Sequence, residues 1–176
     1  PLDPALSYEI GGIMDPMGNA FHTALTANIP GSVVLVTGCG PIGAMVVIAA
    51  RRAGASHIVA TDVVAQPLRM VARVGADETI NVADDKTALA RFAAEKGQFD
   101  VLLECSGNEQ ALRAGFEVVR PRGVVVQLGL SGRELTLPFN MVVAKEFDLR
   151  GAFRFHEEFG VAVGLINQRL VNLKPL

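Results

Sequence analysis

The stretch VVLVTGCGPIGAMVVIAARRAG, residues 33–54, most constrains the fold, because it places three glycines between an apolar β-branched run and a helix-like segment. Gly38, Gly40 and Gly43 have the spacing G-x-G-x-x-G directly after the predicted strand, and Pro41 opens the predicted helix. In this context the first glycine permits a tight turn, the second lets the backbone approach a pyrophosphate, and the third lets helix and strand pack closely. The sequence therefore predicts a dinucleotide-binding turn, and a tight turn without a ligand is the alternative.

Beta-branched runs alternate with helical patterns along the rest of the chain. We expect strands at residues 32–37, 57–62, 78–82, 99–105, 123–129 and 147–153. We expect helices at residues 41–53, 66–74, 86–96, 109–118 and 156–169. The first strand is apolar throughout, as is typical of a strand covered on both faces by crossover helices. The pattern predicts an α/β fold with a doubly wound parallel sheet, the Rossmann fold, in the order 3-2-1-4-5-6 and a three-layer αβα arrangement.

The chain is long enough for one domain with a core of its own. Residues 1–30 are expected to form a lead-in turn and a helix that dock before the sheet begins, closed by Pro30-Gly31. Residues 31–176 are expected to form the dinucleotide-binding domain. Because the chain opens at Pro1 and ends in NLKPL, we expect it to be a piece of a longer protein.

Charge and hydropathy exclude several classes of partner. The chain has 16 basic and 18 acidic side chains, so we expect no nucleic-acid partner. No apolar run reaches about 18 residues without a charge or a breaker, so we expect neither a membrane span nor a signal peptide. Cys39 and Cys105 make no disulfide or metal motif by spacing, which favours a reducing cytoplasm. We interpret both as small packed thiols rather than nucleophiles, because no histidine is paired with them.

An acidic residue follows the glycines at the distance that dinucleotide binding requires. Asp62 ends the second predicted strand, 19 residues beyond Gly43, where a carboxylate accepts hydrogen bonds from the adenosine ribose hydroxyls. This carboxylate favours NAD over NADP, because a 2′-phosphate would meet a like charge and the following VVAQP contains no Arg. A helix cap is the alternative role of Asp62, and the two roles are compatible.

The other predicted strand ends should complete a groove, because ligands on open α/β sheets lie beyond the carboxyl ends of the strands. ECSG (104–107) and LGLSG (128–132) fall there, and ordinary turns are the alternative for both. Arg154 and His156 follow the last predicted strand, within FRFHEEF (153–159). A ligand contact and a surface ion pair are the two interpretations of Arg154, whereas His156 is expected to be a capping or surface residue.

The motifs VLVTGCGPIG, GADETINV, FDVLLECSGN, RPRGVVVQLGL and RGAFRF resemble, in this order, the nucleotide-binding domain of the medium-chain, zinc-dependent alcohol and polyol dehydrogenases. Within that family, LRGAFRFHEEFGVAVGLIN is most similar to L-idonate 5-dehydrogenases and sorbitol dehydrogenases, and IMDPMGNAFHTAL is similar to threonine 3-dehydrogenases. The resemblance implies NAD-dependent, zinc-assisted oxidation of a secondary alcohol of a polyol or sugar acid. Threonine oxidation is the nearest alternative, and a nucleotide-sensing Rossmann domain without metal is the alternative from another class.

The resemblance also implies which residues contact the cofactor. It places Leu128–Leu130 beside the nicotinamide, Cys105 and Ser106 along the adenosine side, and Phe153-Arg154 near nicotinamide and substrate. The full expected set is Gly38, Gly40, Pro41, Ile42, Gly43, Asp62, Val63, Cys105, Ser106, Leu128, Gly129, Leu130, Phe153 and Arg154. Arg154 is also the one candidate for a catalytic contact with the substrate.

The resemblance further bears on the metal and on assembly. Asp15 and His22 are isolated, so their residue types alone suggest a solvated carboxylate and an ordinary helix histidine. Asp15-Pro16 nevertheless stands where the family has a Glu-Pro carboxylate at or near zinc, so Asp15 is a candidate metal-site residue, directly or through water. The other zinc ligands would come from an amino-terminal catalytic domain absent from this chain. Pro67 stands where many relatives have an Arg that contacts the adenosine. Members of the family commonly pair through the edge strand of this domain, so the resemblance also implies a homo-oligomer through FDLRGAF (147–153).

Overall fold

The computed structural model describes residues 1–173 and 176 and has a six-stranded parallel sheet at its centre. The strands are β1 (Val33–Thr37), β2 (His57–Asp62), β3 (Glu78–Asn81), β4 (Phe99–Glu104), β5 (Val119–Gln127) and β6 (Asp148–Gly151). Their order in the sheet is β3-β2-β1-β4-β5-β6, and every neighbouring pair is parallel. This confirms the predicted Rossmann order. It also brings the carboxyl ends of all six strands to one edge.

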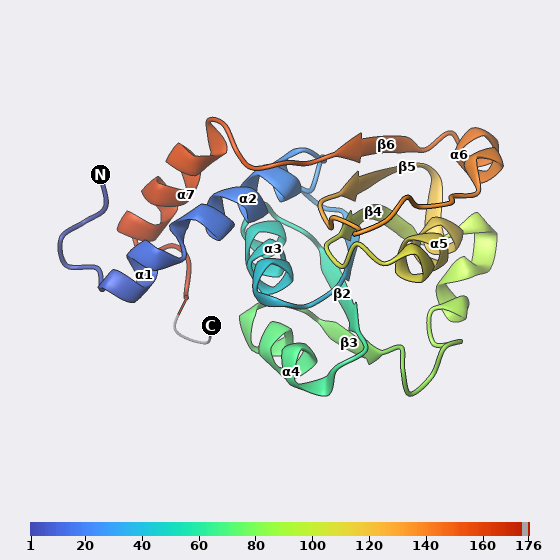
Figure 1. The fold of residues 1–176 in the computed structure, drawn as a ribbon, viewed down its shortest axis with the longest axis horizontal. Helices are drawn as coiled ribbons and strands as arrows, with labels where there is room; N and C mark the ends of the chain where they lie inside the picture. Colours follow the sequence, from blue (N-terminus) through green and yellow to red (C-terminus); the bar gives the residue numbers. More distant parts are fainter. Residues whose placement is uncertain (174–175) are drawn as a thin grey trace.

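Helices cover both faces of the sheet (Figure 1). They are α1 (Tyr8–Gly12), α2 (Met14–Leu25), α3 (Pro41–Arg52), α4 (Ala65–Val74), α5 (Glu109–Val118), α6 (Phe139–Lys145) and α7 (Glu158–Asn167), with the 3-10 segment η1 (Ala90–Lys96). Val34 and Val36 of β1 face the core under α2, α3, α4 and α7, whereas Leu35 faces the core under α5, α6 and η1. The alternation confirms the three-layer arrangement. Among the residues described, no helix combines the length and apolar character needed to cross a membrane.

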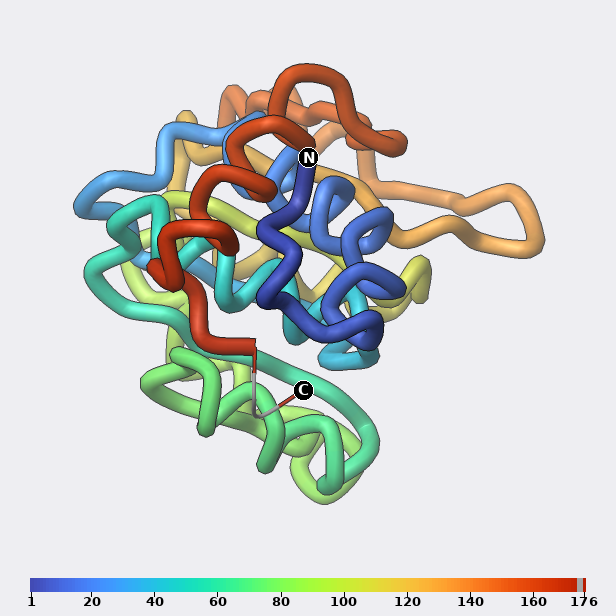
Figure 2. Tube along the Cα trace, turned by 90° about the vertical axis from the view of Figure 1, so that its left-hand side faces the viewer, coloured from blue at the N-terminus to red at the C-terminus, as the bar shows by residue number. Residues whose placement is uncertain are grey.

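The lead-in segment is built into the same core as the sheet. Two helices, α1 and α2, occupy the region expected to hold a turn and one helix. Met17 and Phe21 of α2 are buried in the core that also contains Val34. Figure 2 shows this dark-blue segment beside the red α7, and the Asp3 backbone N–H donates to Asn167 Oδ1 at 2.9 Å. The two ends of the described chain therefore pack together on one face of the sheet.

The helix expected at residues 86–96 does not form as an α-helix, and residues 86–89 are not helical. Only residues 90–96 have helical hydrogen bonds, of the tighter 3-10 type, and Ala94 and Glu95 depart from helical geometry, Glu95 with φ +54°. Just upstream, Asp85 Oδ1 accepts hydrogen bonds from both the N–H and the hydroxyl of Thr87. Such local side-chain bonds offer the backbone an alternative to a regular helix.

Helix α6 was not expected from the sequence. It has seven residues and ends at Lys145, and the next residue, Glu146, has φ +53°, so Glu146 occupies the left-handed position where a glycine usually marks a helix end. The Lys145 ammonium donates to three carbonyl oxygens at the end of α5 and the start of β5, at 2.7–2.9 Å. A cation on carbonyl groups at a helix carboxyl end is favourable. Lys145 thus ties the short α6 to the sheet.

Candidate functional site

The three glycines form the turn from β1 into α3, and two of them are required by the fold itself. Gly38 has φ +83°, and a Cβ there would lie 2.7 Å from the Ser106 backbone nitrogen. A Cβ on Gly43 would lie 1.9 Å from the Gly38 carbonyl oxygen. No side chain fits either place. The turn and close-packing roles expected for Gly38 and Gly43 therefore agree with the geometry.

Gly40 differs from the other two glycines because its own surroundings leave room. It precedes α3 with φ −59°, and a Cβ there would meet no atom within 4 Å. Pro41 and Ile42 follow it at the surface, and no side chain caps the amino end of α3. The free N–H groups of this first turn and the helix dipole favour an anion in the open space. A diphosphate has the charge that this space favours.

Asp62 holds the glycine turn in place. Its Oδ2 accepts a hydrogen bond from the Cys39 N–H at 2.6 Å, and its Oδ1 accepts one from the Val64 N–H at 2.9 Å. Val64 immediately precedes α4, so Asp62 also orders the start of that helix, and Val63 beside it is exposed. An ionised carboxylate has about four acceptor sites, so both oxygens can still accept bonds from ribose hydroxyls. The anchoring and ligand roles of Asp62 are compatible.

The two cysteines are packed thiols, as interpreted from the sequence. Cys39 is 2% exposed, and burial, assisted by the Asp62 charge, raises the pKa of its thiol to about 12. Burial and then the Glu104 charge raise the pKa of the Cys105 thiol well above its ordinary value. The Cys105 Cβ lies 3.7 Å from the place where a Gly43 Cβ would stand. Both thiols therefore remain protonated at neutral pH and serve packing around the glycine turn.

Glu104, at the end of β4, has a central role that no sequence motif indicated. This side chain is fully buried, and its carboxylate accepts hydrogen bonds from the neighbouring donors. Oε1 accepts bonds from the Thr37 hydroxyl at 3.3 Å, the Ser106 N–H at 2.8 Å and the Ser106 hydroxyl. Oε2 accepts bonds from the Gly107 N–H at 3.0 Å and the Gln127 amide at 2.6 Å. The one available signal was an acidic residue directly after the apolar run Val101–Leu103, near the carboxyl end of the predicted strand.

The segment after β5 lies directly against the turn after β4. The N–H groups of Leu128 and Gly129 both donate to the Glu104 carbonyl oxygen at 2.9 Å. A Cβ on Gly129 would lie 2.1 Å from the Gly107 nitrogen, so the two backbones touch. Leu130 is 80% exposed at the tip. The structure thus joins the predicted contacts at the ends of β1, β2, β4 and β5 into one continuous edge.

Phe153 and Arg154 stand apart from this edge. They follow β6, and β4 and β5 lie between β6 and β1 in the sheet. Both side chains are exposed, and the Arg154 guanidinium lies 5.5 Å from the centre of the Phe153 ring. Arg154 has φ +59°, a left-handed conformation that is uncommon for a residue with a side chain. The structure places this pair at the same end of the sheet as the other candidates, but after β6 rather than after β1, β2, β4 or β5.

Asp15 lies in the first turn of α2 and is exposed. On the same helix, His22 Nδ1 lies 3.3 Å from Glu158 Oε1, and the His22 ring meets His156 edge-on at 5.6 Å. Burial raises the pKa of Glu158, but hydrogen bonds from backbone N–H groups and from His22 outweigh it and hold the pKa below its ordinary value. Within the described ranges, no three or more His, Cys, Asp or Glu residues form a group that could hold a metal ion.

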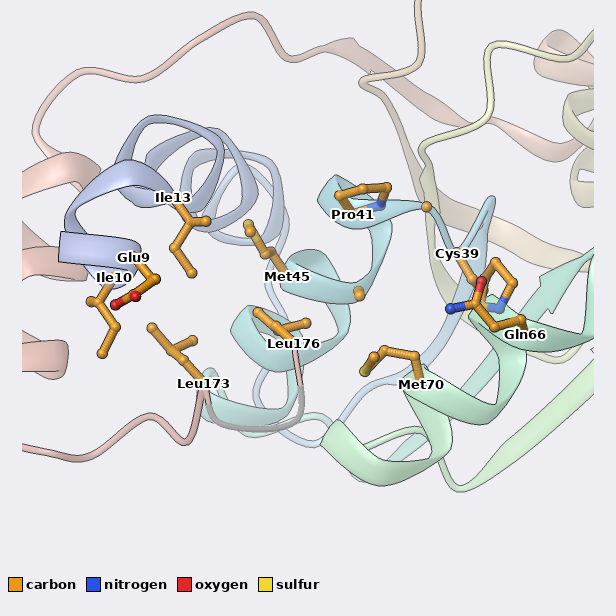
Figure 3. Close-up of a pocket in the computed structure, with 13 residues that line it drawn as sticks. Glu9, Ile10, Ile13, Cys39, Pro41, Met45, Gln66, Met70, Leu173 and Leu176 are labelled. Atoms are coloured by element: carbon orange, nitrogen blue, oxygen red, sulfur yellow. The ribbon is translucent and has the colours of Figure 1, made fainter. Parts of the chain in front are cut away.

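A cleft of about 580 Å³ adjoins the glycine turn (Figure 3). Figure 3 shows Ile10 near one end of the cleft and Gln66 near the other, with Met45 of α3 and Met70 of α4 between them. The complete lining is Glu9, Ile10, Ile13, Cys39, Gly40, Pro41, Ala44, Met45, Gln66, Pro67, Met70, Leu173 and Leu176. Of the predicted cofactor contacts, the lining includes Gly40 and Pro41. The cleft is therefore a neighbour of the predicted groove on the outer side of α3.

Comparison with known proteins identifies the family. Residues 41–168 match the family model of the zinc-binding dehydrogenases. The chain belongs to this family. It is 38% identical over 177 residues to an L-idonate 5-dehydrogenase (NAD(P)(+)) of Escherichia coli, covering 100% of this chain and 51% of that protein. It is 39% identical over 155 residues to an L-threonine 3-dehydrogenase of Chromobacterium violaceum, covering 87% and 45%.

Solved structures agree with this assignment. The crystal structure of L-idonate 5-dehydrogenase from Escherichia coli matches with a TM-score of 0.94 at 36% identity, covering 100% of this chain and 51% of that one. The 2R,3R-butanediol dehydrogenase of Bacillus subtilis matches with a TM-score of 0.90 at 25% identity, covering 99% and 51%. The chain thus spans about half the length of the relatives it matches. The family resemblance found in the sequence is confirmed.

Proposed function

We propose that this chain is the NAD-binding domain of a zinc-dependent dehydrogenase that oxidises a secondary alcohol of a polyol or sugar acid, as an L-idonate 5-dehydrogenase does. The observation that carries the proposal is the turn between β1 and α3. There Gly38 and Gly43 leave no room for side chains, Gly40 opens onto free space, and Asp62 anchors the turn. In this proposal residues 1–30 are the lead-in, residues 31–176 bind the cofactor, and the catalytic domain lies elsewhere in the parent protein.

The residues present fit a dinucleotide. The N–H groups at the start of α3, beside Pro41 and Ile42, would bind the diphosphate, because Gly40 leaves the approach open. Asp62, with Val63 beside it, would bind the adenosine ribose, and Ser106 would line the adenosine side. Leu128–Leu130 would support the nicotinamide, with Phe153 and Arg154 contributing contacts to nicotinamide and substrate. When bound, NAD⁺ supplies the hydride acceptor for oxidation of the alcohol.

Asp62 supports a preference for NAD over NADP, since its carboxylate would repel a 2′-phosphate. The name of the Escherichia coli relative allows both cofactors, so the preference is tested by direct titration. The chain has no tryptophan, so NADH and NADPH fluorescence can be followed without indole emission. We expect NADH to bind at least about tenfold more tightly than NADPH. Asp62→Asn should narrow the difference, whereas Asp84→Asn, at an exposed position away from the turn, should leave it unchanged.

Two outcomes of this titration contradict the proposal at different levels. NADPH binding as tight as NADH binding would show that Asp62 does not select the cofactor. A chain that binds neither cofactor would remove the proposed function altogether. Binding of NADH by this chain, followed by absence of any oxidation by the parent protein, would favour the nucleotide-sensing Rossmann domain.

The zinc belongs to the proposal for the parent protein. The described part of this chain offers no metal-binding group of three or more ligand residues, and Asp15 is the single candidate carried over from the family. These residues therefore do not fit a complete zinc site by themselves. We expect the purified chain to contain no stoichiometric zinc when its metal content is measured by mass spectrometry. In the parent, Asp15→Asn should lower zinc content or activity if its carboxylate lies at the metal.

L-threonine is the second candidate substrate, because an L-threonine 3-dehydrogenase is as similar in sequence as the L-idonate enzyme. The two candidates are separated by assaying the parent protein with L-idonate, sorbitol and L-threonine. Activity on L-idonate or sorbitol supports the polyol and sugar-acid assignment, and activity on L-threonine alone replaces it.

The edge strand β6 supports a homo-oligomer as part of the proposal. Its residues Asp148–Gly151 are all exposed, and β6 pairs with β5 on one side. A second copy could therefore extend the sheet across a two-fold axis. The sedimentation coefficient of the parent measures its oligomeric state, and Leu149→Pro should weaken pairing through this edge. The cytoplasmic location favoured by the cysteines stays a prediction.

A further inference from the structure

A buried carboxylate joins three strand ends beneath the proposed groove. Glu104 ends β4, and its side chain accepts hydrogen bonds from Thr37 at the end of β1 and from Gln127 at the end of β5. It also accepts hydrogen bonds from the main-chain N–H groups of Ser106 and Gly107, which form the turn after β4. All of these partners are donors, which suits an ionised carboxylate because it only accepts. Such buried, charge-assisted bonds fix geometry more firmly than exposed ones.

The turns that Glu104 joins also interlock through two glycines. Gly107 has φ +65°, and a Cβ there would lie 2.3 Å from the Leu130 carbonyl oxygen. A Cβ on Gly129 would lie 2.7 Å from Glu104 Oε2, so the backbone after β5 rests directly on the carboxylate. Gln127 adds a further link, because its amide donates to both Glu104 Oε2 and the Gly129 carbonyl oxygen, each at 2.6 Å. The turns after β4 and β5 therefore form one connected body.

We propose that Glu104 is a positioning residue that holds the turn after β4, on the adenosine side of the cofactor groove, in register with the segment Leu128–Leu130, on the nicotinamide side. The inference rests on the proposed function. Glu104 acts through its neighbours and has no need to touch the cofactor, since the side chain is fully buried. The sequence had assigned the contacts to the turn residues themselves. The structure adds the group that sets the distance between those turns.

The same strand carries a matched control at its other end. Asp100, near the start of β4, accepts bonds from the Val33 N–H of β1 at 2.7 Å and from the Arg120 side chain of β5 at 2.6 Å. Asp100 and Glu104 are thus both acidic links from β4 to β1 and β5, at opposite ends of the strand. Only the Glu104 link lies at the carboxyl edge, where the cofactor would bind. A purely structural role would make the two residues equivalent for ligand binding.

Three variants of the full chain separate positioning from stability. Glu104→Gln keeps the shape but replaces one acceptor oxygen with a donor that faces other donors. Gln127→Ala removes only the link to β5 and leaves the other bonds of Glu104 in place, so it remains informative if Glu104→Gln does not fold. Asp100→Asn is the control. Dissociation constants are measured for NADH and for AMP, which lacks the nicotinamide half, and melting temperatures are measured alongside.

We expect Glu104→Gln to weaken NADH binding about tenfold and Gln127→Ala about threefold, because the nicotinamide side loses its fixed position. Gln127→Ala should leave AMP binding within about twofold of the wild type. Asp100→Asn should lower the melting temperature but leave the ratio of the NADH and AMP constants unchanged.

The inference is overturned if Glu104→Gln and Gln127→Ala both bind NADH as tightly as the wild type does. It is also overturned if Asp100→Asn weakens NADH binding as much as Glu104→Gln. Equal weakening of NADH and AMP by Gln127→Ala also overturns it, since a local effect on the nicotinamide side predicts a difference. If the wild-type chain does not bind NADH, the proposed function falls, and this inference falls with it.

Discussion

Gly43→Ala is the sharpest test of how the glycine turn is built. The added methyl group would lie 1.9 Å from the Gly38 carbonyl oxygen, whereas real Cβ contacts are essentially never shorter than 3.0 Å. Helix and turn must therefore separate by about 1.1 Å at this point. The obstacle is main chain rather than a flexible side chain, so it cannot rotate away. The substitution forces apart the amino end of α3 and the carboxyl end of β1.

The expected cost follows from two opposing terms. Overpacking of a rigid contact costs about 3 kcal/mol, at the upper end of the usual range, because a backbone segment must move. Alanine in a helix is more favourable than glycine by about 0.5–1 kcal/mol, which offsets part of that cost. A net loss of about 2 kcal/mol in the free energy of unfolding should lower the melting temperature by about 4–8 °C for a chain of this length.

Two further substitutions control for the chemistry of adding a methyl group. Gly160→Ala, at an exposed position of α7 with no atom within 4 Å of the new Cβ, should raise stability slightly. Gly40→Ala has equally open surroundings and should cost under about 1 kcal/mol of stability. Its methyl group would nevertheless enter the space where the diphosphate is proposed to approach. NADH affinity should therefore fall about tenfold or more in Gly40→Ala while the fold persists.

Calorimetry and NADH titration of the three variants decide between packing and ligand roles. A Gly43→Ala chain that melts within about 1 °C of the wild type would refute the packing argument. A Gly40→Ala chain that binds NADH normally would refute the proposed approach of the diphosphate. The two outcomes are independent, because one concerns the fold and the other the ligand.

Two other predictions concern groups whose pKa is shifted. Cys39 and Cys105 should react slowly with a thiol reagent at mildly alkaline pH in the folded chain and rapidly in denaturant, because burial raises the pKa of both thiols; fast labelling of the folded chain would contradict the packing of the turn. For Asp77, burial raises the pKa, but hydrogen bonds from the Ile58 N–H and Arg51 outweigh it and hold the pKa below its ordinary value. The stability from this carboxylate is present above its unfolded-state pKa and is lost as the pH falls through the lower folded-state pKa. Asp77→Asn should therefore lower the free energy of unfolding by at most about 1 kcal/mol at neutral pH, since the group is partly exposed. In urea denaturation, the free energy of unfolding of this variant should fall less steeply than that of the wild type as the pH is lowered. An equally steep fall would contradict the contribution of Asp77 to the pH dependence.

The features that sequence predicted well are those fixed by backbone geometry. An apolar run such as β1 must be covered on both faces, and parallel strands joined by helices follow few topologies, so the sheet order was predictable. Gly38 and Gly43 were predictable for the same reason, since their places exclude any Cβ. The expected strand and helix bounds near the glycine turn differ from the observed ones by only a few residues.

The features that sequence missed depend on partners distant in the chain. Glu104 bonds to Thr37 and Gln127, which lie 67 and 23 residues away, and to main-chain N–H groups that no residue pattern records. Helix α6 is likewise joined through Lys145 to carbonyl oxygens of α5 and β5, whereas the segment before η1 contains a local bond between Asp85 and Thr87. Pattern reading finds periodic elements, whereas these contacts have no period.

In the proposed site, Asp62 and Glu104 would couple cofactor selectivity to the shape of the groove. Each acidic residue ends a strand, and each carboxylate accepts main-chain N–H groups from the turns that follow β1, β2 or β4. A substitution that removes both carboxylate oxygens of Asp62, such as Asp62→Ala, therefore releases the Cys39 N–H and loosens the glycine turn along with removing the charge. Exchange of Asp62 for a residue without an acceptor should weaken NADH and NADPH alike, because the diphosphate site moves. A switch toward NADP consequently needs a neutral residue at this position that still accepts the Cys39 bond.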